Sequence, residues 1–304
     1  MPGITGEPWR VQILTALEPL RTALSALKSG DNPAKAGDHP KLALVPTMGA
    51  LHEGHLTLVR EAKRLAHHVV VSIFVNPRQF GPNEDLATYP RQLEADAALL
   101  AAEGVDVLWT PTVDVIYPAG YATTVQVGGL DAVLCGAARP GHFDGVATVV
   151  TKLFNQVQPD VALFGEKDWQ QLAIIRRMAR DLDMTHPHAD SILGVPTVRE
   201  ADGLAMSSRN KYLTAEERAA APAMNRAMRE AAGKIVAGEP VAEALAALQA
   251  AVLAAGFRQI DYAELRDAVT LEDVAQWDGH PARLLVAAHL GKARLIDNVA
   301  VVAG

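Results

Sequence analysis

The stretch Val45-Pro46-Thr47-Met48-Gly49-Ala50-Leu51-His52-Glu53-Gly54-His55 follows the apolar run Leu42 to Val45 and leads into the amphipathic segment His55 to Ala66. This order predicts a buried strand, a tight loop and a helix. In an open α/β sheet, ligands bind at the carboxyl end of a strand, facing the unpaired N–H groups of the next helix. Gly49 and Gly54 allow the backbone to approach a ligand closely. We therefore expect a ligand-binding turn here.

Two histidines lie at the expected start of this helix. His52 and His55 are three residues apart, so they can face the same side and donate hydrogen bonds to phosphate oxygens. The alternative is a pair of unrelated surface histidines. The coincidence of a strand, two glycines and paired histidines favours the phosphate site.

The same alternation of short apolar runs and longer amphipathic segments continues on both sides. Strands are expected at Leu42 to Val45, Val69 to Val75, Val105 to Trp109 and Val161 to Phe164, and helices at His55 to Ala66, Leu93 to Glu103 and Ile174 to Leu182. Alternating strands and helices predict right-handed crossovers and a Rossmann-like open parallel sheet with helices on both faces. The sheet should extend to about Gly194. Upstream, we expect a helix over Val11 to Leu27 and a polar surface loop over Ser29 to His39.

The pattern changes after Pro196. Thr214 followed by Glu217 is a capping-box signature that opens an alanine-rich helix, and a second alanine-rich helix is expected over Val241 to Ala255. Strand-like runs follow at Gln259 to Leu265 and Arg283 to Leu290. We therefore expect two domains: a Rossmann-like ligand-binding domain over 1–195 and a smaller α+β lid domain over 196–304.

Composition narrows the classes of partner. Of the 304 residues, 28 are Lys or Arg and 35 are Asp or Glu, giving a formal charge of −7 without a basic block. A nucleic-acid partner is therefore not expected. No secretory signal pattern is seen, and no apolar run approaches the roughly 20 residues that span a bilayer. We expect a soluble cytoplasmic protein with no membrane partner. The single cysteine, Cys135, is interpreted as structural.

A second candidate phosphate cluster is Phe164-Gly165-Glu166-Lys167-Asp168, at the end of another expected strand. Lys167 can place positive charge against a phosphate, and Asp168 can accept a ribose hydroxyl. By itself this sequence is also an ordinary turn between a strand and a helix.

A third candidate is the loop Met206-Ser207-Ser208-Arg209-Asn210, whose hydroxyls, guanidinium and amide can wrap a triphosphate. Its alternative is a solvated loop. Three phosphate-capable clusters in one chain are stronger evidence than any one of them.

A fourth segment, Val75 to Asp85, follows the second strand of the expected sheet. Asn76 and Gln79 offer neutral donors and acceptors, which suit a hydroxyl-bearing carboxylate. Gln171, four residues after Lys167, can reach the same pocket. The prolines and glycine of this segment also suit a plain loop.

These motifs together resemble a known family. His52-Glu53-Gly54-His55 resembles the histidine signature of the nucleotidyltransferase superfamily, and Met206 to Arg209 resembles its second phosphate loop. From about Lys41 onward the chain resembles the pantothenate synthetase (pantoate–β-alanine ligase) family. The segments that carry this narrower resemblance are Asn76 to Asp85, Arg139 to Phe143 with Gly145, Gly165 to Asp168 with Gln170 and Gln171, Val198 to Gly203, Asp261 to Asp267 and Arg294 to Asn298.

The resemblance implies a ligase that joins pantoate to β-alanine. The carboxylate of pantoate would attack the α-phosphorus of ATP, which is a substrate of the enzyme, and pyrophosphate would leave. The amine of β-alanine would then attack the resulting pantoyl-adenylate, giving pantothenate and AMP. The implied catalytic residues are His55, His52 and Lys167, with the histidines on the triphosphate, His55 as proton donor and Lys167 on the α-phosphate.

The resemblance also assigns the binding residues. The implied ATP site comprises Met48, Gly49, His52, His55, Gly165, Lys167, Asp168, Val198, Met206, Ser207, Ser208 and Arg209, with the serine loop holding pyrophosphate. Gln79, Gln171 and Asn76 would bind pantoate, and Gln79 would also meet β-alanine. Mg²⁺ should be carried mainly by the phosphates. Asp96 is the one protein candidate for it, and a solvated helix carboxylate is the alternative there.

Assembly is implied in the same way. The family resemblance indicates a homodimer formed through the α/β domain, with the lid hinged near Pro196. Two rival functions remain open. One is a nucleotidyltransferase that moves AMP or CMP onto a phosphorylated acceptor, which would need a basic pocket where Asn76, Gln79 and Gln171 stand. The other is a nucleotide-binding sensor without chemistry.

Overall fold

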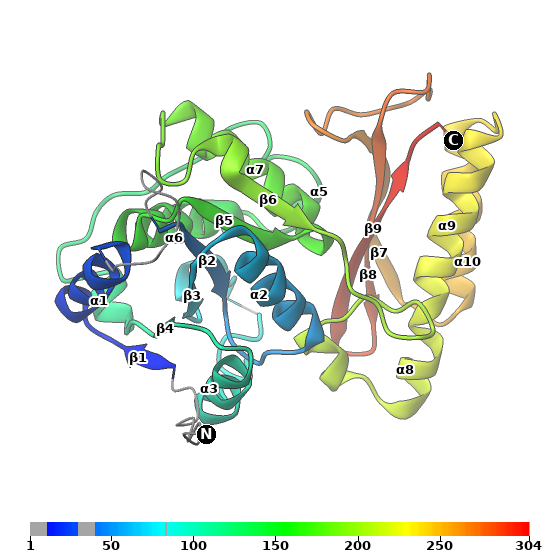
Figure 1. The fold of residues 1–304 in the computed structure, drawn as a ribbon. Coiled ribbons are helices and arrows are strands. Elements are labelled where there is room, and N and C mark those ends of the chain that lie inside the picture. The colour runs from blue at the N-terminus through cyan, green and yellow to red at the C-terminus, as the bar shows by residue number, and fades with distance from the viewer. Residues whose placement is uncertain (1–10, 30–39, 83, 304) are drawn as a thin grey trace, which may run out of the picture.

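The computed structural model describes residues 11–29, 40–82 and 84–303. It holds two sheets, which lie in different parts of the molecule (Figure 1). The first is parallel throughout, with the order β1-β4-β3-β2-β5-β6, and the second is antiparallel, with the order β7-β8-β9. The predicted Rossmann-like sheet with a smaller α+β part is confirmed.

Four of the six strands of the parallel sheet match predicted apolar runs, and the first and the last were not predicted as strands. The strands are β1 (Gln12–Leu14), β2 (Leu42–Thr47), β3 (His68–Ile73), β4 (Val107–Trp109), β5 (Val161–Gly165) and β6 (Ile192–Val195). Successive side chains of a strand face opposite sides, so Leu42 and Leu44 belong to one core while Ala43 and Val45 belong to another. Both faces of the sheet are therefore buried.

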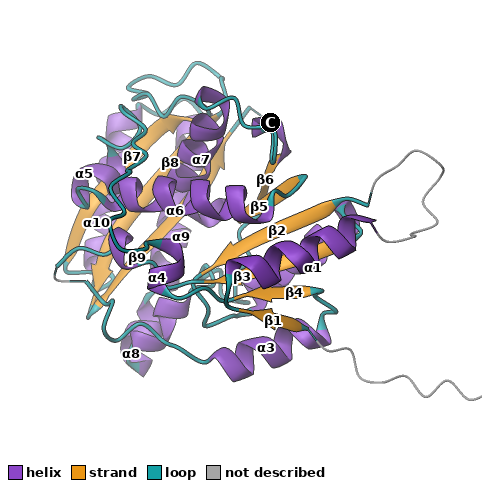
Figure 2. Ribbon diagram, turned by 90° about the vertical axis from the view of Figure 1, so that its left-hand side faces the viewer, coloured by secondary structure: helices purple, strands orange, loops and turns teal. Residues whose placement is uncertain are grey.

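Helices cover both faces (Figure 2). The core that contains Leu44 also holds residues of α1 (Leu17–Ser29), α6 (His142–Val157) and α7 (Trp169–Asp181). The core that contains Val45 holds residues of α2 (Glu53–Leu65) and α3 (Leu93–Ala102). Short helices α4 (Val113–Ile116) and α5 (Leu134–Ala138) lie between β4 and α6 in the chain, in a region where no element was predicted.

The N-terminal prediction was wrong in part. Val11 to Leu27 was expected to form one helix, but Gln12–Leu14 forms the edge strand β1 and the helix starts at Leu17. The backbone N–H of Gln12 donates to Asp106, and the strand pairs in parallel with β4. A three-residue strand is too short for its alternation to show in the sequence. The loop predicted over Ser29 to His39 lies outside the described residues, apart from Ser29.

The second part consists of α8 (Ala215–Ala220), α9 (Pro222–Val236), α10 (Val241–Ala254), β7 (Gln259–Asp267), β8 (Ala282–Leu290) and β9 (Ala293–Val301). The predicted capping box is present, with Thr214 accepting from the N–H of Glu217 and Glu217 accepting from that of Thr214. Two strands were predicted, and β9 completes the sheet as a third.

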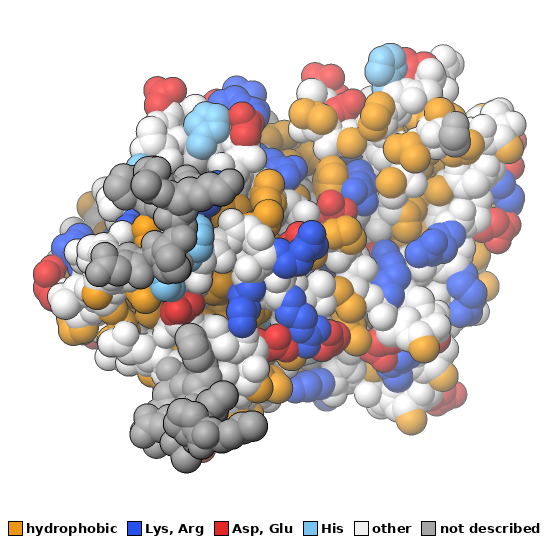
Figure 3. Space-filling model, in the orientation of Figure 1, with side chains coloured by type: hydrophobic (Ala, Val, Ile, Leu, Met, Phe, Trp, Pro, Cys, Tyr) orange, Lys and Arg blue, Asp and Glu red, His pale blue; other side chains and the backbone are white. Residues whose placement is uncertain are grey.

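The antiparallel sheet forms a wall between two cores. Leu284 and Val286 pack with α9 and α10, whereas Leu285 and Ala287 pack with the first part, beside α5. The two parts therefore share a core, and the domain boundary between residues 195 and 196 stays a prediction. No helix in the described ranges is long and apolar enough to cross a membrane. On the face shown in Figure 3, Lys and Arg (blue) are interspersed with Asp and Glu (red).

Candidate active site

A cavity of about 240 Å³ lies at the carboxyl ends of β2 and β5, where the two parts meet. Most of the predicted site residues line it: Met48, His52, His55, Gln79, Gly165, Lys167, Asp168, Gln171, Val198, Met206, Ser207, Ser208 and Arg209. We call it the inner cavity. Gly49, Asn76 and Asp96 are not among its lining residues. Segments far apart in the chain therefore share one site.

The two histidines are fixed by the start of α2. The Nδ1 atom of His52 accepts a hydrogen bond from the N–H of Gly54 at 3.2 Å, and the Nδ1 atom of His55 accepts one from the N–H of His52 at 3.3 Å. In a neutral imidazole the other ring nitrogen then carries the hydrogen. Each ring therefore has Nε2–H available as a donor.

Both histidines are neutral at pH 7. Burial, followed by the charges of Lys167 and Lys211, lowers the pKa of His52 to about 4. Burial, followed by His52 and Lys167, lowers the pKa of His55 to about 3. A ring with so low a pKa holds no second proton to transfer at neutral pH. At neutral pH the His55 ring is therefore a hydrogen-bond donor in its neutral form, and its role as proton donor stays a prediction.

Gly54 is required by the packing of the His52 ring. A Cβ atom at Gly54 would lie 2.9 Å from Cε1 and 3.0 Å from Nδ1 of His52, and 3.9 Å from Cβ of Met206. The first two separations are closer than van der Waals contact allows. The glycine therefore leaves room for the His52 ring at the helix start.

Asp96 on α3 holds the turn between β2 and α2 through backbone hydrogen bonds. Its carboxylate accepts hydrogen bonds from the N–H groups of Ala50 and Leu51, both at 2.9 Å, and from Nε2 of Gln92 at 3.1 Å. Ala50 has a φ of +52°, in the left-handed region that a residue with a Cβ rarely adopts, and Gly49 before it has a φ of +81°. The carboxylate therefore holds an unfavourable backbone in place.

The two interpretations of Asp96 have different outcomes. The solvated carboxylate is wrong, because Asp96 is 1% exposed. Magnesium binding stays a prediction, but both carboxylate oxygens already accept from protein donors. In the described part of the chain, no three or more His, Cys, Asp or Glu side chains are grouped so that they could hold a metal ion.

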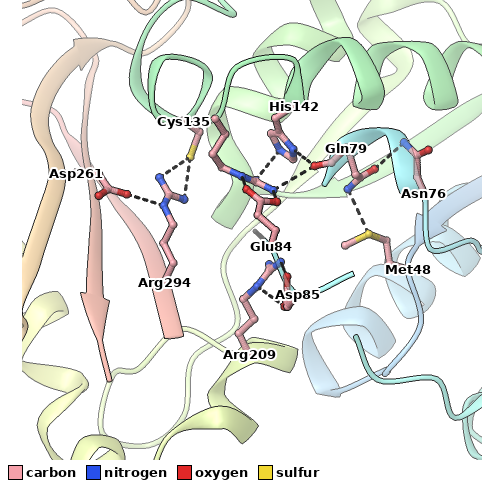
Figure 4. A network of polar contacts seen from close by, with 11 residues as sticks. Met48, Asn76, Gln79, Glu84, Asp85, Cys135, His142, Arg209, Asp261 and Arg294 are labelled. Carbon is pink, nitrogen blue, oxygen red and sulfur yellow. Dashed lines mark hydrogen bonds and ion pairs between the residues drawn. The ribbon is translucent and has the colours of Figure 1, made fainter. Parts of the chain in front are cut away.

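Asn76 and Gln79 belong to one short turn, η1 (Pro77–Gln79) and its cap (Figure 4). The buried Asn76 donates to Oε1 of Gln79 at 3.1 Å and to the carbonyl of Gly145 at 3.0 Å, and it accepts from Tyr117 at 2.8 Å. Nε2 of Gln79 contacts Sδ of Met48 at 3.2 Å. Asn76 thus orients Gln79, which lines the cavity, and its own contact with pantoate stays a prediction.

Arg139 and His142 were not among the predicted site residues, yet both line the inner cavity. Nδ1 of His142, at 2.8 Å, and a guanidinium nitrogen of Arg139, at 3.3 Å, contact the backbone carbonyl of Gln79. Arg139 also forms a two-point ion pair with Glu84. Burial, followed by Arg139, lowers the pKa of His142 to about 4. The only signal in the sequence was the Arg139 to Phe143 segment, which carries part of the family resemblance.

The serine loop reaches the cavity through a hairpin. Arg199 and Ala205 form a β-bridge, and the N–H of Met206 donates to Val198. Ser207 caps the next turn by accepting from the N–H of Arg209 at 3.2 Å. Ser207, Ser208 and Arg209 thus line the inner cavity together with Lys167.

A larger cleft of about 1140 Å³ adjoins the inner cavity and shares Lys167, Asp168, Gln171, Ser207 and Arg209 with it. Its far wall comes from β7 and β9 and includes Asp261, Tyr262 and Arg294. Buried Cys135 lies there, 3.0 Å from the hydroxyl of Tyr262. The site thus has room for substrates larger than the inner cavity alone could hold.

Comparison with known proteins agrees with this geometry. The family model described as pantoate-beta-alanine ligase matches residues 12–300. The pantothenate synthetase of Novosphingobium aromaticivorans is 70% identical over 260 residues, which cover 86% of this chain and 91% of that protein.

Two solved structures are also similar. The pantothenate synthetase from Thermus thermophilus has a TM-score of 0.86 and 47% identity, covering 96% of this chain and 100% of that one. The pantoate-beta-alanine ligase from Francisella tularensis, solved in complex with beta-gamma ATP and beta-alanine, has a TM-score of 0.75 and 33% identity over 95% of this chain and 97% of that one. On this evidence, the chain belongs to the pantoate-beta-alanine ligase family.

Proposed function

We propose that this ligase joins pantoate to β-alanine in two steps through a pantoyl-adenylate, consuming ATP and giving pantothenate, AMP and pyrophosphate. The observation that carries the proposal is the inner cavity, whose wall combines three phosphate-binding segments with the uncharged Gln79 and Gln171. The relative from Francisella tularensis was solved with a form of ATP and β-alanine, which supports ATP as a substrate here.

The first step activates a carboxylate, which is otherwise unreactive toward amines because its oxygen is a poor leaving group. An oxygen of the pantoate carboxylate attacks the α-phosphorus, and the bond to the bridging oxygen of pyrophosphate breaks. In the second step the β-alanine amine attacks the acyl carbon, AMP leaves with the carboxylate oxygen, and the amine loses a proton to solvent. No covalent bond to the protein is needed, so the protein acts by positioning and charge stabilisation.

The phosphate-binding residues then have separate roles. His52 and His55 donate from Nε2 to the triphosphate, since both Nδ1 atoms accept from the backbone. Lys167 stabilises the charge that builds at the α-phosphate. Ser207, Ser208 and Arg209 hold the departing pyrophosphate. Backbone and side-chain atoms of Met48, Gly49, Gly165, Asp168, Val198 and Met206 complete the remainder of the nucleotide site.

Gln79 and Gln171 provide the substrate end of the cavity. Gln79 binds the hydroxyl and carboxylate groups of pantoate and later meets β-alanine. Neutral partners suit a carboxylate that must react, because they orient it without neutralising its charge in an ion pair. This composition favours a ligase over a nucleotidyltransferase with a phosphorylated acceptor.

Magnesium is expected to arrive with the triphosphate. Both carboxylate oxygens of Asp96 accept hydrogen bonds from backbone and side-chain donors, so Asp96 would have to lose one of these bonds to coordinate the ion. We further propose that the protein is a cytoplasmic homodimer with a hinge near Pro196.

The test is an AMP-release assay in which pantoate and β-alanine are present together or omitted in turn. The proposal expects AMP and an amide product in equal amounts only when both are present. A nucleotidyltransferase would release pyrophosphate with a phosphorylated acceptor and form no amide. A nucleotide sensor would show no amine-dependent release of AMP. Either result would contradict the proposed function.

A further inference from the structure

Two adjacent residues of β9, Asp297 and Asn298, are buried at the junction of the two parts of the molecule. Neighbouring side chains of a strand point to opposite faces of the sheet. Asp297 faces α9, where it meets Asn225, and Asn298 faces the first part, where it meets the turn that carries Lys167. Asn298 lines neither the inner cavity nor the larger cleft, whereas Asp297 lines the larger cleft only.

Asn298 holds the backbone of the lysine turn. Its Nδ2 atom donates to the carbonyl of Glu166 at 2.8 Å and to that of Lys167 at 3.0 Å. These two bonds use both hydrogens of the amide. The acceptor side is also used, because Oδ1 accepts from Arg283 at 3.0 Å. The partners fix which way the amide points, and the side chain has no donor left for a ligand.

Arg283 also contacts the same turn. It donates to the carboxylate of Glu166 at 3.0 Å, and its guanidinium carbon lies 3.6 Å from the ring centroid of Trp169. Arg283 of β8 therefore holds Glu166 and Trp169, which lie on either side of Lys167, and Asn298 of β9 holds the backbone between them. A three-residue turn with this many external bonds has little freedom to move on its own.

Asp297 holds the hairpin that ends in the serine loop. Its two oxygens accept from the two terminal nitrogens of Arg199 at 2.7 and 2.9 Å, a paired geometry that fixes orientation as well as distance. Arg199 also donates to the carbonyl of Gly203, within the same hairpin. The backbone N–H of Asn298 donates to the Asp297 carboxylate at 2.8 Å, which links the two residues directly.

We propose that Asp297 and Asn298 are a positioning pair that sets the Lys167 turn and the serine loop relative to each other for the first chemical step. The inference rests on the proposed function, in which Lys167 acts on the α-phosphate and Ser207 to Arg209 act on pyrophosphate. Departure of pyrophosphate needs both groups in place at once. A displacement of about 1 Å in such a group can cost about 10²-fold in rate.

The experiment measures the two steps separately in the full-length enzyme. Single-turnover release of pyrophosphate from ATP and pantoate, without β-alanine, reports the first step, and addition of β-alanine reports the second. The main variant is Asn298→Leu, which keeps a similar side-chain size and removes all three hydrogen bonds. Asn298→Ser, which keeps one donor, is the second variant and should recover part of the rate. Asp297→Asn tests the ion pair between Asp297 and Arg199, which holds the hairpin of the serine loop.

Val286→Ala is the matched control. Val286 lies opposite Asp297 in the register of β8 and β9 and is fully buried, but it faces the α9 core and has an apolar side chain that cannot form a hydrogen bond. The control should lower the Tm without changing the ratio of the two rates.

We expect Asn298→Leu to slow the first step about 10²-fold and the second step much less. Equal slowing of both steps in proportion to the loss of Tm, as in the control, would show a merely structural role and overturn the inference. A folded Asn298→Leu enzyme with a normal first step would overturn it as well. If the wild type releases no pyrophosphate without β-alanine, the proposed function itself fails, which is a separate result.

Discussion

His55 accepts a hydrogen bond from the backbone N–H of His52 through Nδ1, at 3.3 Å, while His52 accepts from Gly54 in the same way. The ring centroids are 4.1 Å apart. One short helix start therefore fixes two neutral imidazoles side by side, each with Nε2–H available as a donor. The bonds that cap the helix also select the tautomers that a phosphate site needs.

Replacing His55 should therefore affect turnover more than folding. We expect His55→Ala to lower kcat/KM about 10²-fold or more, because it removes a donor to the transition state. The loss of the cap should cost about 1 kcal/mol of unfolding free energy. His67→Ala is the control, since His67 is exposed and its Nδ1 atom accepts a hydrogen bond from the N–H of Lys41, away from the inner cavity. Steady-state kinetics and urea unfolding measure both quantities, and near-normal turnover of His55→Ala would refute the assigned role.

The low pKa values of three histidines predict acid sensitivity. The pKa values of His52, His55 and His142 are about 4, 3 and 4 in the folded protein, against an ordinary value of 6.5. The unfolded chain therefore binds more protons below pH 6.5. Stability should be full above that pH and fall toward pH 4, by at most about 1.4 kcal/mol per pH unit for each histidine.

Unfolding by urea between pH 8 and pH 4.5 measures this slope. The variant His142→Gln separates the histidine contribution from that of the carboxylates, because it removes one of the three groups. Its stability should depend less steeply on pH between 6.5 and 4.5 than that of the wild type. Identical slopes for the two proteins would mean that His142 is not kept neutral by folding.

Asp96 should act through the backbone of the Met48 to Leu51 loop. In Asp96→Asn, an NH₂ group must face at least one of the donors that the carboxylate now accepts from, which should cost about 1–3 kcal/mol. We expect KM for ATP to rise as the loop relaxes. Asp160→Asn is the control, because Asp160 accepts from the N–H of Leu42 at the other end of β2. Recovery of Asp96→Asn activity at high Mg²⁺ would instead indicate that Asp96 binds the ion.

Assembly and closure can be measured together. We expect a homodimer formed through the α/β domain, since closed two-fold symmetry is the commonest arrangement of soluble oligomers. ATP should draw the part beyond Pro196 toward the histidine turn and make the particle more compact. Small-angle scattering with and without ATP tests both expectations. A monomer at all concentrations would refute the dimer, and a profile that ignores nucleotide would refute the closure.

Much of the fold could be predicted because its signals are local. The short apolar run Leu42 to Val45 predicts a buried strand, and the amphipathic segment His55 to Ala66 has the period of a helix. Gln12–Leu14 was missed because three residues are too few to show a period, and its state is decided by pairing with β4. The strand β9 was also not predicted, although its segment Arg294 to Asn298 carries part of the family resemblance.

The site was predictable to the extent that its residues form sequence motifs. His52 and Lys167 are marked by glycines and by strand ends, and Ser207 is marked by the hydroxyl, guanidinium and amide groups of its loop. Asp96, Arg139 and Asn298 act through hydrogen bonds to segments 45, 60 and 131 residues away, and no local pattern encodes such partners. The pKa of His55 likewise depends on burial created by the whole fold. Residues that line the cavity are therefore easier to predict than the residues that position them.

The central claim is that the carboxylate of pantoate becomes bonded to the α-phosphorus of ATP. It can be tested most directly with pantoate labelled with oxygen-18 in its carboxylate, followed by mass spectrometry of the nucleotide after complete turnover with β-alanine. The account predicts AMP that carries one oxygen-18 atom, because the carboxylate oxygen leaves with AMP when the amide forms. Unlabelled AMP, or ADP as the nucleotide product, would contradict it.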